Sequence, residues 1–397
     1  MTRRLRPALV ALAVLAACAD APESDAPAST ASTVAGAVDV PADSGAQAPR
    51  LVLDADGTPV LSWVQPDGDG HALRASRWTG DGWGPAETAD SGADWFVNWA
   101  DTPGVVPTAD GLVAHTLVRH PEGDSPYAYD AAVLAGGRRQ LLHDDGRAAE
   151  HGFVSTASLA DGRTAFVWLD GREQSGHHGG GAMTLRTATV ASDGTISDEA
   201  LLDARTCDCC PTATVATDAG LVVAYRDRTE AEVRDVAVVR LVDGVWTEPV
   251  VPHADGWTID ACPVNGPALA ADGDRVALAW YTGAEPSRVQ VTLSDDSGAT
   301  WTDAVRIDGG TPIGRVGVAF LPDGGAVVSW LEMVGETAEL RLRRVAAGGT
   351  AGDTQTVATM DAGRASGVPH VVALGDRVLM AWTDASAATV RTAVVDP

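Results

Sequence analysis

The sequence predicts an all-β propeller made of seven repeated units, and three observations support this prediction. A short run of β-branched and small apolar residues recurs along the chain and ends in an aromatic or polar residue. Successive copies lie 50 to 57 residues apart between about residue 49 and residue 397. Each copy follows an Asp/Gly turn, such as those at residues 161–162 and 323–324. Repeats of this length with four strand-like runs per unit are typical of propeller blades.

We take the recurring run as the second strand of each four-stranded blade. Its seven copies end at Trp63, His115, Trp168, Tyr225, Trp280, Trp330 and Trp382. The last unit has room for three strands, and a segment near residues 34–40 would supply its missing outer strand and close the ring. A ring of six blades with one irregular unit is the main alternative.

One predicted turn carries a specific motif. Residues 294–301 follow the pattern S-x-D-x-G-x-T-W, which is filled by Ser294, Asp296, Gly298, Thr300 and Trp301. This pattern resembles the Asp-box of sialidase-like (BNR repeat) propellers. The resemblance implies a turn between the third and fourth strands of a blade, in which the aspartate binds the turn amides and the tryptophan packs between blades. It implies architecture and says nothing about activity.

The N-terminus has the order of an export signal. Basic residues at positions 3–6 precede an apolar run over residues 7–17, which is too short to span a bilayer as a helix. Small residues then lead into Cys18, and this end resembles a bacterial lipobox. The resemblance implies cleavage before Cys18 and a lipid on its sulfur. The Ala19 that follows resembles the sorting pattern of outer-membrane lipoproteins.

These features divide the chain into three expected parts. Residues 1–17 form the signal peptide, residues 18–48 form a flexible tether rich in Ala, Ser, Pro and Asp, and residues 49–397 form the propeller. We expect the protein to be anchored by lipid to the outer membrane and to face the periplasm.

The composition excludes several kinds of chemistry. The chain has no lysine, so all 28 basic residues are arginine, and a Schiff base or a phosphate-loop lysine is ruled out. The net charge of −26, without any basic stripe, argues against nucleic acid as a partner. The expected partners are the membrane, through the lipid, and an anionic carbohydrate, and we expect a monomer.

The strand order predicts a working face. In a four-stranded blade, the loop after the second strand and the loop before the first strand open on the same side of the ring. Cys, His, Trp and most loop arginines fall in these loops, so this side is the expected binding face. The candidate ligand-binding residues are Arg172, Arg226, Arg228, Asn265, Arg315 and Arg364.

Four cysteines follow the tether: Cys207, Cys209, Cys210 and Cys262. Export favours disulfides, for example Cys210 with Cys262 and Cys207 with Cys209. The alternative is a thiolate site for copper or zinc, to which His151 or the pair at residues 177–178 would add nitrogen ligands. A redox or free-thiol role is the third interpretation.

The resemblance to sialidases also implies a hydrolase hypothesis. Sialidases bind a carboxylate with three arginines and use a tyrosine–glutamate nucleophile with an aspartate acid/base. The catalytic candidates are Asp170, Tyr225, Asp227, Tyr281 and Glu332. Two departures weaken the hypothesis, because residues 49–51 lack the expected Arg-Ile-Pro type motif and the cysteine cluster is foreign to sialidases.

Three functions therefore remain open at this stage. The leading one is a cell-envelope propeller that binds an anionic glycan or a metal on its arginine- and cysteine-bearing face. The second is a glycoside hydrolase of the sialidase type, and the third is a scaffold for envelope assembly. The arginines near residue 226 would then form an ion-pair network that joins adjacent loops.

Overall fold

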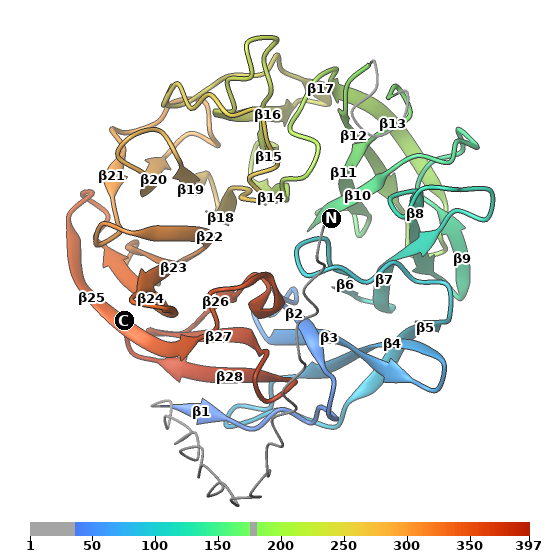
Figure 1. Cartoon of the computed structure of the whole chain (residues 1–397), viewed down its shortest axis with the longest axis horizontal. Coiled ribbons are helices and arrows are strands. Elements are labelled where there is room, and N and C mark those ends of the chain that lie inside the picture. The colour runs from blue at the N-terminus through green and yellow to red at the C-terminus, as the bar shows by residue number, and fades with distance from the viewer. Residues whose placement is uncertain (1–35, 175–180) are drawn as a thin grey trace, which may run out of the picture. The chain divides into compact units, whose positions relative to one another are not determined.

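The computed structural model describes residues 36–174 and 181–397, and these form a ring of seven four-stranded antiparallel blades (Figure 1). The predicted seven-bladed propeller is therefore confirmed. Cys18, the signal segment and residues 177–178 lie outside the described residues. No helix within the described residues is long and apolar enough to cross a membrane.

The blades follow one another around the ring in chain order, and each runs from its inner to its outer strand. Blade 1 contains β2 (Gln47–Leu53), β3 (Pro59–Asp67), β4 (Gly70–Arg77) and β5 (Glu87–Gly92). Blade 2 contains β6 (Gly104–Thr108), β7 (Gly111–Arg119), β8 (Tyr129–Ala135) and β9 (Arg138–Leu141). Blade 3 contains β10 (His151–Ser158), β11 (Thr164–Asp170), β12 (Thr184–Val190) and β13 (Ile196–Asp203). Blade 4 contains β14 (Ala213–Thr217), β15 (Gly220–Arg226), β16 (Val236–Val242) and β17 (Val245–Trp246).

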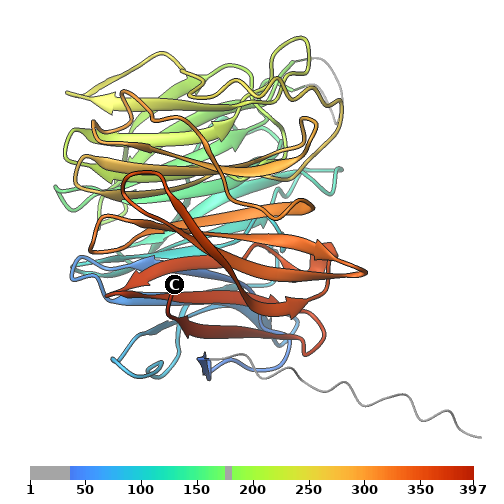
Figure 2. The same cartoon turned by 90° about the vertical axis from the view of Figure 1, so that its left-hand side faces the viewer.

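The remaining blades complete the ring. Blade 5 contains β18 (Ala268–Asp272), β19 (Arg275–Thr282), β20 (Arg288–Ser294) and β21 (Val305–Arg306). Blade 6 contains β22 (Pro312–Phe320), β23 (Ala326–Val334), β24 (Thr337–Val345) and β25 (Ala351–Met360). Blade 7 contains β26 (His370–Leu374), β27 (Arg377–Asp384), β28 (Thr389–Val395) and β1 (Ala37–Val38), and the 3₁₀ turn η1 (Arg364–Ser366) precedes β26. In the side view the strands run from one face of the ring to the other, and the loops that connect them form these two faces (Figure 2).

Blade 7 is closed by a strand from the other end of the chain. β1 pairs antiparallel with β28, with Ala37 opposite Ala393 and Val38 opposite Thr392. The Thr392 hydroxyl also donates to the Val38 carbonyl oxygen at 2.8 Å. The expected closing strand near residues 34–40 is therefore present, and it covers an edge that would otherwise expose unpaired backbone groups.

Tryptophans of the second strands fill the spaces between blades. Trp63, Trp168 and Trp330 are fully buried, and each indole nitrogen donates to a side chain two residues further along the same strand. The acceptors are Gln65 at 3.0 Å, Asp170 at 2.8 Å and Glu332 at 2.5 Å. A buried indole N–H needs such a partner, so the W-x-(Q/D/E) pattern is a structural element of the blades.

The Asp-box motif forms the turn between β20 and β21, as the resemblance implies. Asp296 accepts from the Thr300 amide at 2.8 Å and from its hydroxyl at 2.7 Å. The Ser294 hydroxyl oxygen accepts from the Gly298 amide at 2.9 Å, and Gly298 has a φ of 77° that favours glycine. Trp301 packs against the apolar cluster between blades 4 and 5.

Candidate functional site

A cavity of about 750 Å³ runs along the axis of the ring. Its wall comes from the inner strands β2, β6, β10, β14, β18, β22 and β26, and most of the lining side chains are small and apolar. Polar groups enter the wall mainly from Arg50, Asp101, Ser155, Thr212 and His370. In a propeller, the loops at each end of the central channel surround the opening at that end.

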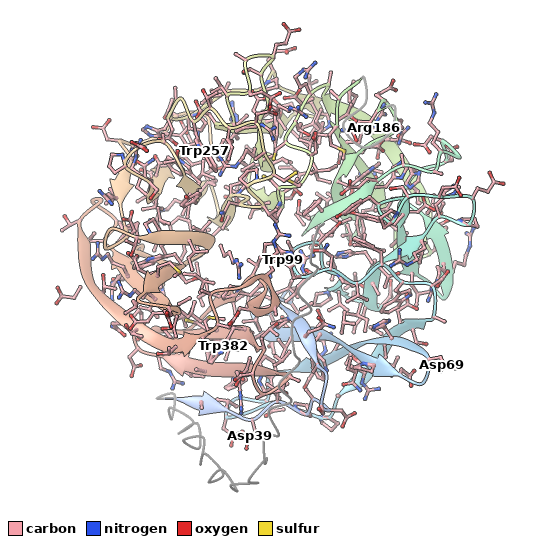
Figure 3. The ribbon with its side chains drawn as sticks, in the orientation of Figure 1. Asp39, Asp69, Trp99, Arg186, Trp257 and Trp382 are labelled. Carbon is pink, nitrogen blue, oxygen red and sulfur yellow. The ribbon has the colours of Figure 1, made fainter. Side chains whose placement is uncertain are left out.

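An aromatic side chain marks one end of this channel. Trp99 is half-buried and lies near the centre of the ring (Figure 3). The guanidinium of Arg315 lies over its indole, 4.6 Å from the ring centroid, and donates to the carbonyl oxygens of Gly363 and Gly367. Burial, and then the neighbouring charge of exposed Arg364, lowers the pKa of Arg315 to about 10. We call this end, defined by Trp99, Arg315 and Arg364, the channel mouth.

The backbone is strained where three inner strands begin at the mouth. Ala48, Phe153 and Arg315 have φ values of 54°, 52° and 53°, which are uncommon for residues other than glycine. Each lies in a register shift at the start of β2, β10 or β22. Bulges re-aim side chains, and strain of this kind concentrates at functional sites. The repetition on one face supports that face as the working one.

A tyrosine hydroxyl joins two carboxyl groups beside the mouth. The Tyr129 hydroxyl is 2.7 Å from an oxygen of Asp101 and 3.0 Å from an oxygen of Glu150. Burial raises the pKa of Asp101 to about 6, and burial together with the Asp101 charge raises that of Glu150 to about 8. Glu150 is the half-buried member of the group, whereas Tyr129 and Asp101 are 1% exposed. Perturbed carboxyl groups of this kind are typical of acid–base and binding sites.

Most of the arginines predicted to bind a ligand are held by the protein itself. Arg226 is 1% exposed and donates to the carbonyl oxygens of Asn265, Arg234 and Tyr281. Arg228 pairs with Asp208 and Glu232, and Arg172 pairs with Asp145, Asp170 and Glu199. These arginines therefore join adjacent loops, which was the structural alternative to a ligand clamp.

Asn265 and Arg364 complete the set of predicted ligand-binding residues. The Asn265 amide accepts from the Arg315 backbone N–H at 2.8 Å and donates to the Ile313 carbonyl oxygen at 3.1 Å. It therefore fixes the strained residue that carries the Arg315 side chain. Arg364 is exposed at the mouth, so it is the predicted arginine best placed to meet a ligand.

The predicted catalytic residues are bound by partners of their own. Tyr225 is buried and donates to Asp203 at 2.5 Å, and Tyr281 lies edge-on against Trp257. Glu332 accepts from Trp330 and from two turn amides, Gly309 and Thr311. Asp170 binds Trp168 and Arg172, and Asp227 accepts from the Arg228 amide. Within the described residues, the tyrosine–glutamate pair is instead formed by Tyr129 and Glu150.

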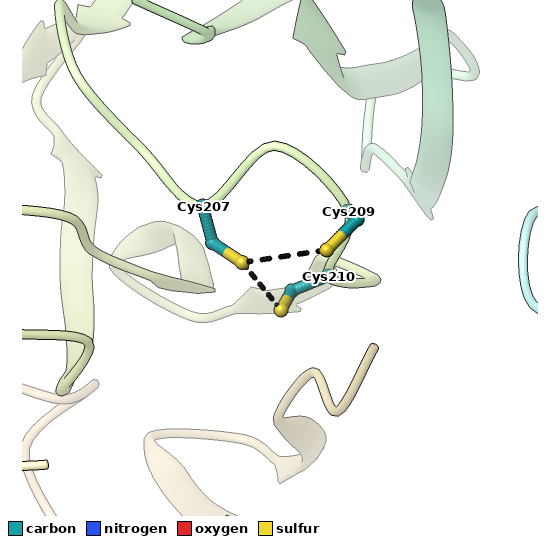
Figure 4. A group of neighbouring side chains, drawn as sticks. All are labelled: Cys207, Cys209 and Cys210. Carbon is teal, nitrogen blue, oxygen red and sulfur yellow. Dashed lines mark hydrogen bonds between the residues drawn. The ribbon is translucent and has the colours of Figure 1, made fainter. Parts of the chain in front are cut away.

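The cysteines form a thiol cluster on the loop between β13 and β14 (Figure 4). The Cys207 sulfur is 2.6 Å from that of Cys210 and 4.0 Å from that of Cys209. No sulfur pair among the described residues lies at the length of a disulfide bond, so the bridges expected from export stay a prediction. His151 contacts a different group of residues.

His151 belongs to a buried ion network between blades 2 and 3. Its Nδ1 is 3.4 Å from Asp130, and its Nε2 is 3.1 Å from Asp145 and 3.7 Å from Asp170. Burial lowers the pKa of His151, but the hydrogen bonds to Asp130 and Asp145 raise it by a larger amount. The pKa is therefore raised overall, to about 9. The residue is therefore cationic at neutral pH and balances part of the buried negative charge.

This network fits a metal ion poorly, although two histidines and three aspartates lie close together. The rings of His143 and His151 stack with centroids 3.6 Å apart and planes 17° apart. A histidine nitrogen binds a metal in the plane of its ring, and in stacked rings these directions run side by side. His143 and His151 therefore do not bind one ion together, and the carboxylates of Asp145 and Asp170 beside His151 are already paired with Arg172.

No model of a known protein family matches the sequence, and no curated protein matches it either. Solved structures do match the fold. A PL25 ulvan lyase bound to -[GlcA(1-4)Rha3S]- is 13% identical with a TM-score of 0.52, and the match covers 90% of this chain and 94% of the lyase. The polysaccharide lyase Uly1 is 10% identical with a TM-score of 0.51, covering 94% of each chain.

Two further structures extend this comparison. A protein of unknown function from Dyadobacter fermentans is 13% identical with a TM-score of 0.50, covering 91% of this chain and 98% of that one. An intramolecular trans-sialidase from Ruminococcus gnavus is 10% identical with a TM-score of 0.43, covering 88% and 94%. The chain thus shares its propeller fold with these polysaccharide lyases. At these identities the likeness concerns the fold alone.

Proposed function

We propose that the protein is a lipid-anchored propeller of the cell envelope that binds an acidic polysaccharide at the channel mouth. The observation that carries the proposal is the pairing of a half-buried aromatic ring with two arginines at the end of the axial channel. Trp99 exposes part of its indole at the mouth, with Arg315 over the ring, and Arg364 offers an exposed guanidinium for a carboxylate or sulfate. The fold is shared with a lyase bound to a glucuronate-containing saccharide, which supports this class of ligand.

Glu150, the less buried of the two carboxyl groups beside the mouth, is compatible with an anionic ligand at neutral pH. Because the pKa of Glu150 is raised to about 8, this carboxyl group is mostly protonated below that pH. A neutral carboxylic acid donates a hydrogen bond and does not repel the ligand. Above pH 8 Glu150 ionises, and its charge opposes binding.

Replacing Trp99 or Arg364 with alanine is expected to weaken binding of oligosaccharides with the repeat GlcA(1-4)Rha3S roughly tenfold. Calorimetric titration against a neutral glucan oligosaccharide measures the effect. Arg377→Ala is the matched control, since Arg377 is an exposed arginine at the first position of β27, at the opposite end of its blade. Equal affinities in all three variants would contradict the proposal.

Binding by the wild type is also expected to fall above pH 8, and Glu150→Gln is expected to remove this fall.

A second candidate function is cleavage of the glycan at the same mouth. It is favoured by the Tyr129 hydroxyl between two carboxyl groups of raised pKa, because a protonated Glu150 can act as a general acid. Product formation from the same oligosaccharide, followed by chromatography, tests this function. Turnover that persists in Glu150→Gln would exclude Glu150 as the acid.

The anchor is proposed from the sequence of the first 19 residues. Cys18→Ser is expected to move the protein from the membrane fraction to the soluble fraction and to abolish labelling by radioactive palmitate. Membrane association that is unchanged in this variant would refute the lipid anchor.

A further inference from the structure

Three cysteine sulfurs converge on one short loop, and the proposed glycan-binding function does not use them. The Sγ atoms of Cys207, Cys209 and Cys210 all lie within 4.8 Å of one another (Figure 4). Cys207 and Cys210 are 0% and 1% exposed, and Cys209 is half-buried. The three thiols therefore face one another in a pocket with one partly open side.

A guanidinium contacts this cluster. Arg234 donates to the Cys207 sulfur at 3.3 Å, and its other nitrogen binds Glu232 at 2.7 Å. The positive charge of Arg234 therefore stabilises negative charge on this sulfur. A buried cysteine that served only to fill space would need neither the other sulfurs nor the guanidinium.

The Cys207 and Cys210 sulfurs are close enough to bond to each other on oxidation. They are 2.6 Å apart, between a sulfur–sulfur bond of about 2.05 Å and the separation of two unbonded sulfurs, so a Cys207–Cys210 disulfide is the competing state of the cluster. Three donors around one ion at metal–sulfur distances of about 2.3 Å would lie about 4.0 Å from one another in a trigonal plane. The Cys207–Cys209 distance is already 4.0 Å, and Cys210 would need to move away from Cys207 by about 1.4 Å to match it.

We propose that Cys207, Cys209 and Cys210 form a thiolate site for a soft monovalent ion, Cu(I). Thiolate sulfur selects Cu(I) among the common metal ions, and three sulfurs satisfy it without further ligands. Each thiol that coordinates loses its proton, so binding releases protons and leaves an anionic copper–thiolate group. Arg234, in contact with Cys207, stabilises that negative charge.

The neighbouring carboxylates are not free to bind an ion. Arg228 binds Asp208, which lies between the cysteines in sequence, at 2.8 Å and also binds Glu232 at 2.9 Å. These carboxylates are therefore already paired with arginine, which leaves the sulfurs as the ligands at this loop. Glu232 itself has a left-handed φ of 58°, so the loop that carries Arg228 and Arg234 is held in a specific conformation.

The test is a Cu(I) titration of the reduced full chain under argon, in competition with a chromogenic Cu(I) chelator. The chain carries Cys18→Ser so that its fifth cysteine contributes no thiol. We expect one Cu(I) per chain, an ultraviolet thiolate-to-copper charge-transfer band, and loss of three thiols to a thiol reagent. Cys207→Ser and Cys210→Ser are each expected to weaken Cu(I) binding at least a hundredfold.

Cys262→Ser tests a fourth sulfur, because the Cys262 thiol is in hydrogen-bond contact with Cys209 although it lies outside the group of three. A smaller loss of Cu(I) affinity than in Cys207→Ser is expected. Thermal melting of each variant without copper separates loss of a ligand from loss of the fold. The proposal is overturned by any of three results: unchanged affinity in Cys207→Ser, Zn²⁺ binding as tight as Cu(I) binding, or disulfides among residues 207–210 in protein isolated from cells with its thiols blocked.

Discussion

Replacing Asp170 with alanine is expected to lower the free energy of unfolding by about 3–5 kcal/mol. Asp170 is 0% exposed, and its two oxygens accept from the Trp168 indole and from the Arg172 side chain and amide. Its removal leaves the buried Trp168 indole N–H without its acceptor. It also removes one of the carboxylates that balance the positive charges of Arg172 and His151. Urea denaturation followed by tryptophan fluorescence measures the loss.

Asp384 provides a matched control for Asp170. It also lies two residues after a second-strand tryptophan, Trp382, but its side chain is 26% exposed and binds only local groups and Arg391. Asp384→Ala is therefore expected to cost about 1 kcal/mol or less. Equal losses in the two variants would show that the W-x-D pattern, and not the buried network, determines stability. A stable Asp170→Ala protein would return Asp170 to the catalytic candidates.

The stability of the protein is expected to fall as the pH rises from about 6.5 to 9. The pKa of His151 is raised to about 9 in the folded state and is about 6.5 in the unfolded chain. A raised histidine pKa stabilises the fold fully below pH 6.5, and this contribution disappears as the pH passes through 9. The difference of about 2.5 pH units corresponds to a loss of about 3 kcal/mol. Midpoints of urea unfolding at pH 6 and pH 9.5 measure it.

The ionisation of Glu150 also lowers the stability of the fold as the pH rises, so its effect has to be separated from that of His151. The pKa of Glu150 is raised to about 8, so its ionisation destabilises the fold between about pH 4.5 and 8. The comparison is therefore made in a Glu150→Gln background, with and without His151→Gln. The His151→Gln protein is expected to be less stable at pH 6 but to show little change up to pH 9.5. A parallel fall in both proteins would refute the assignment to His151.

The repeat and its closure could be predicted because each depends on local pattern. The spacing of Trp63, Trp168, Trp280 and Trp330 gives the period, and the Asp-box turn follows from residues within eight positions. The outer strand of blade 7 could be predicted from the short last unit. Seven units fitted the chain, and the structure has seven blades.

The site was harder to predict because its contacts join distant loops. Tyr129, Asp101 and Glu150 share no motif, and only the folding of blades 2 and 3 brings them together. The arginines look alike in sequence, yet whether each is free depends on carbonyl groups up to 55 residues away, as for Arg226 and Tyr281. The sequence does carry a local signal for two of these residues. Asp170 and Glu332 stand two residues after a tryptophan, and this position lets each accept a hydrogen bond from the indole nitrogen.

The pairing of β1 with β28 has a consequence for the order of folding. Blade 7 combines residues 37–38 with residues 389–395, so its last sheet contact joins segments more than 350 positions apart in the chain. Such contacts form slowly, because the intervening chain must first be ordered. Blades 1 to 6 can form in succession as the polypeptide emerges, but the ring cannot lock until β28 is available. A ribosome-bound or partly translocated chain is therefore an open arc with two unprotected sheet edges, and it depends most on chaperones during that interval.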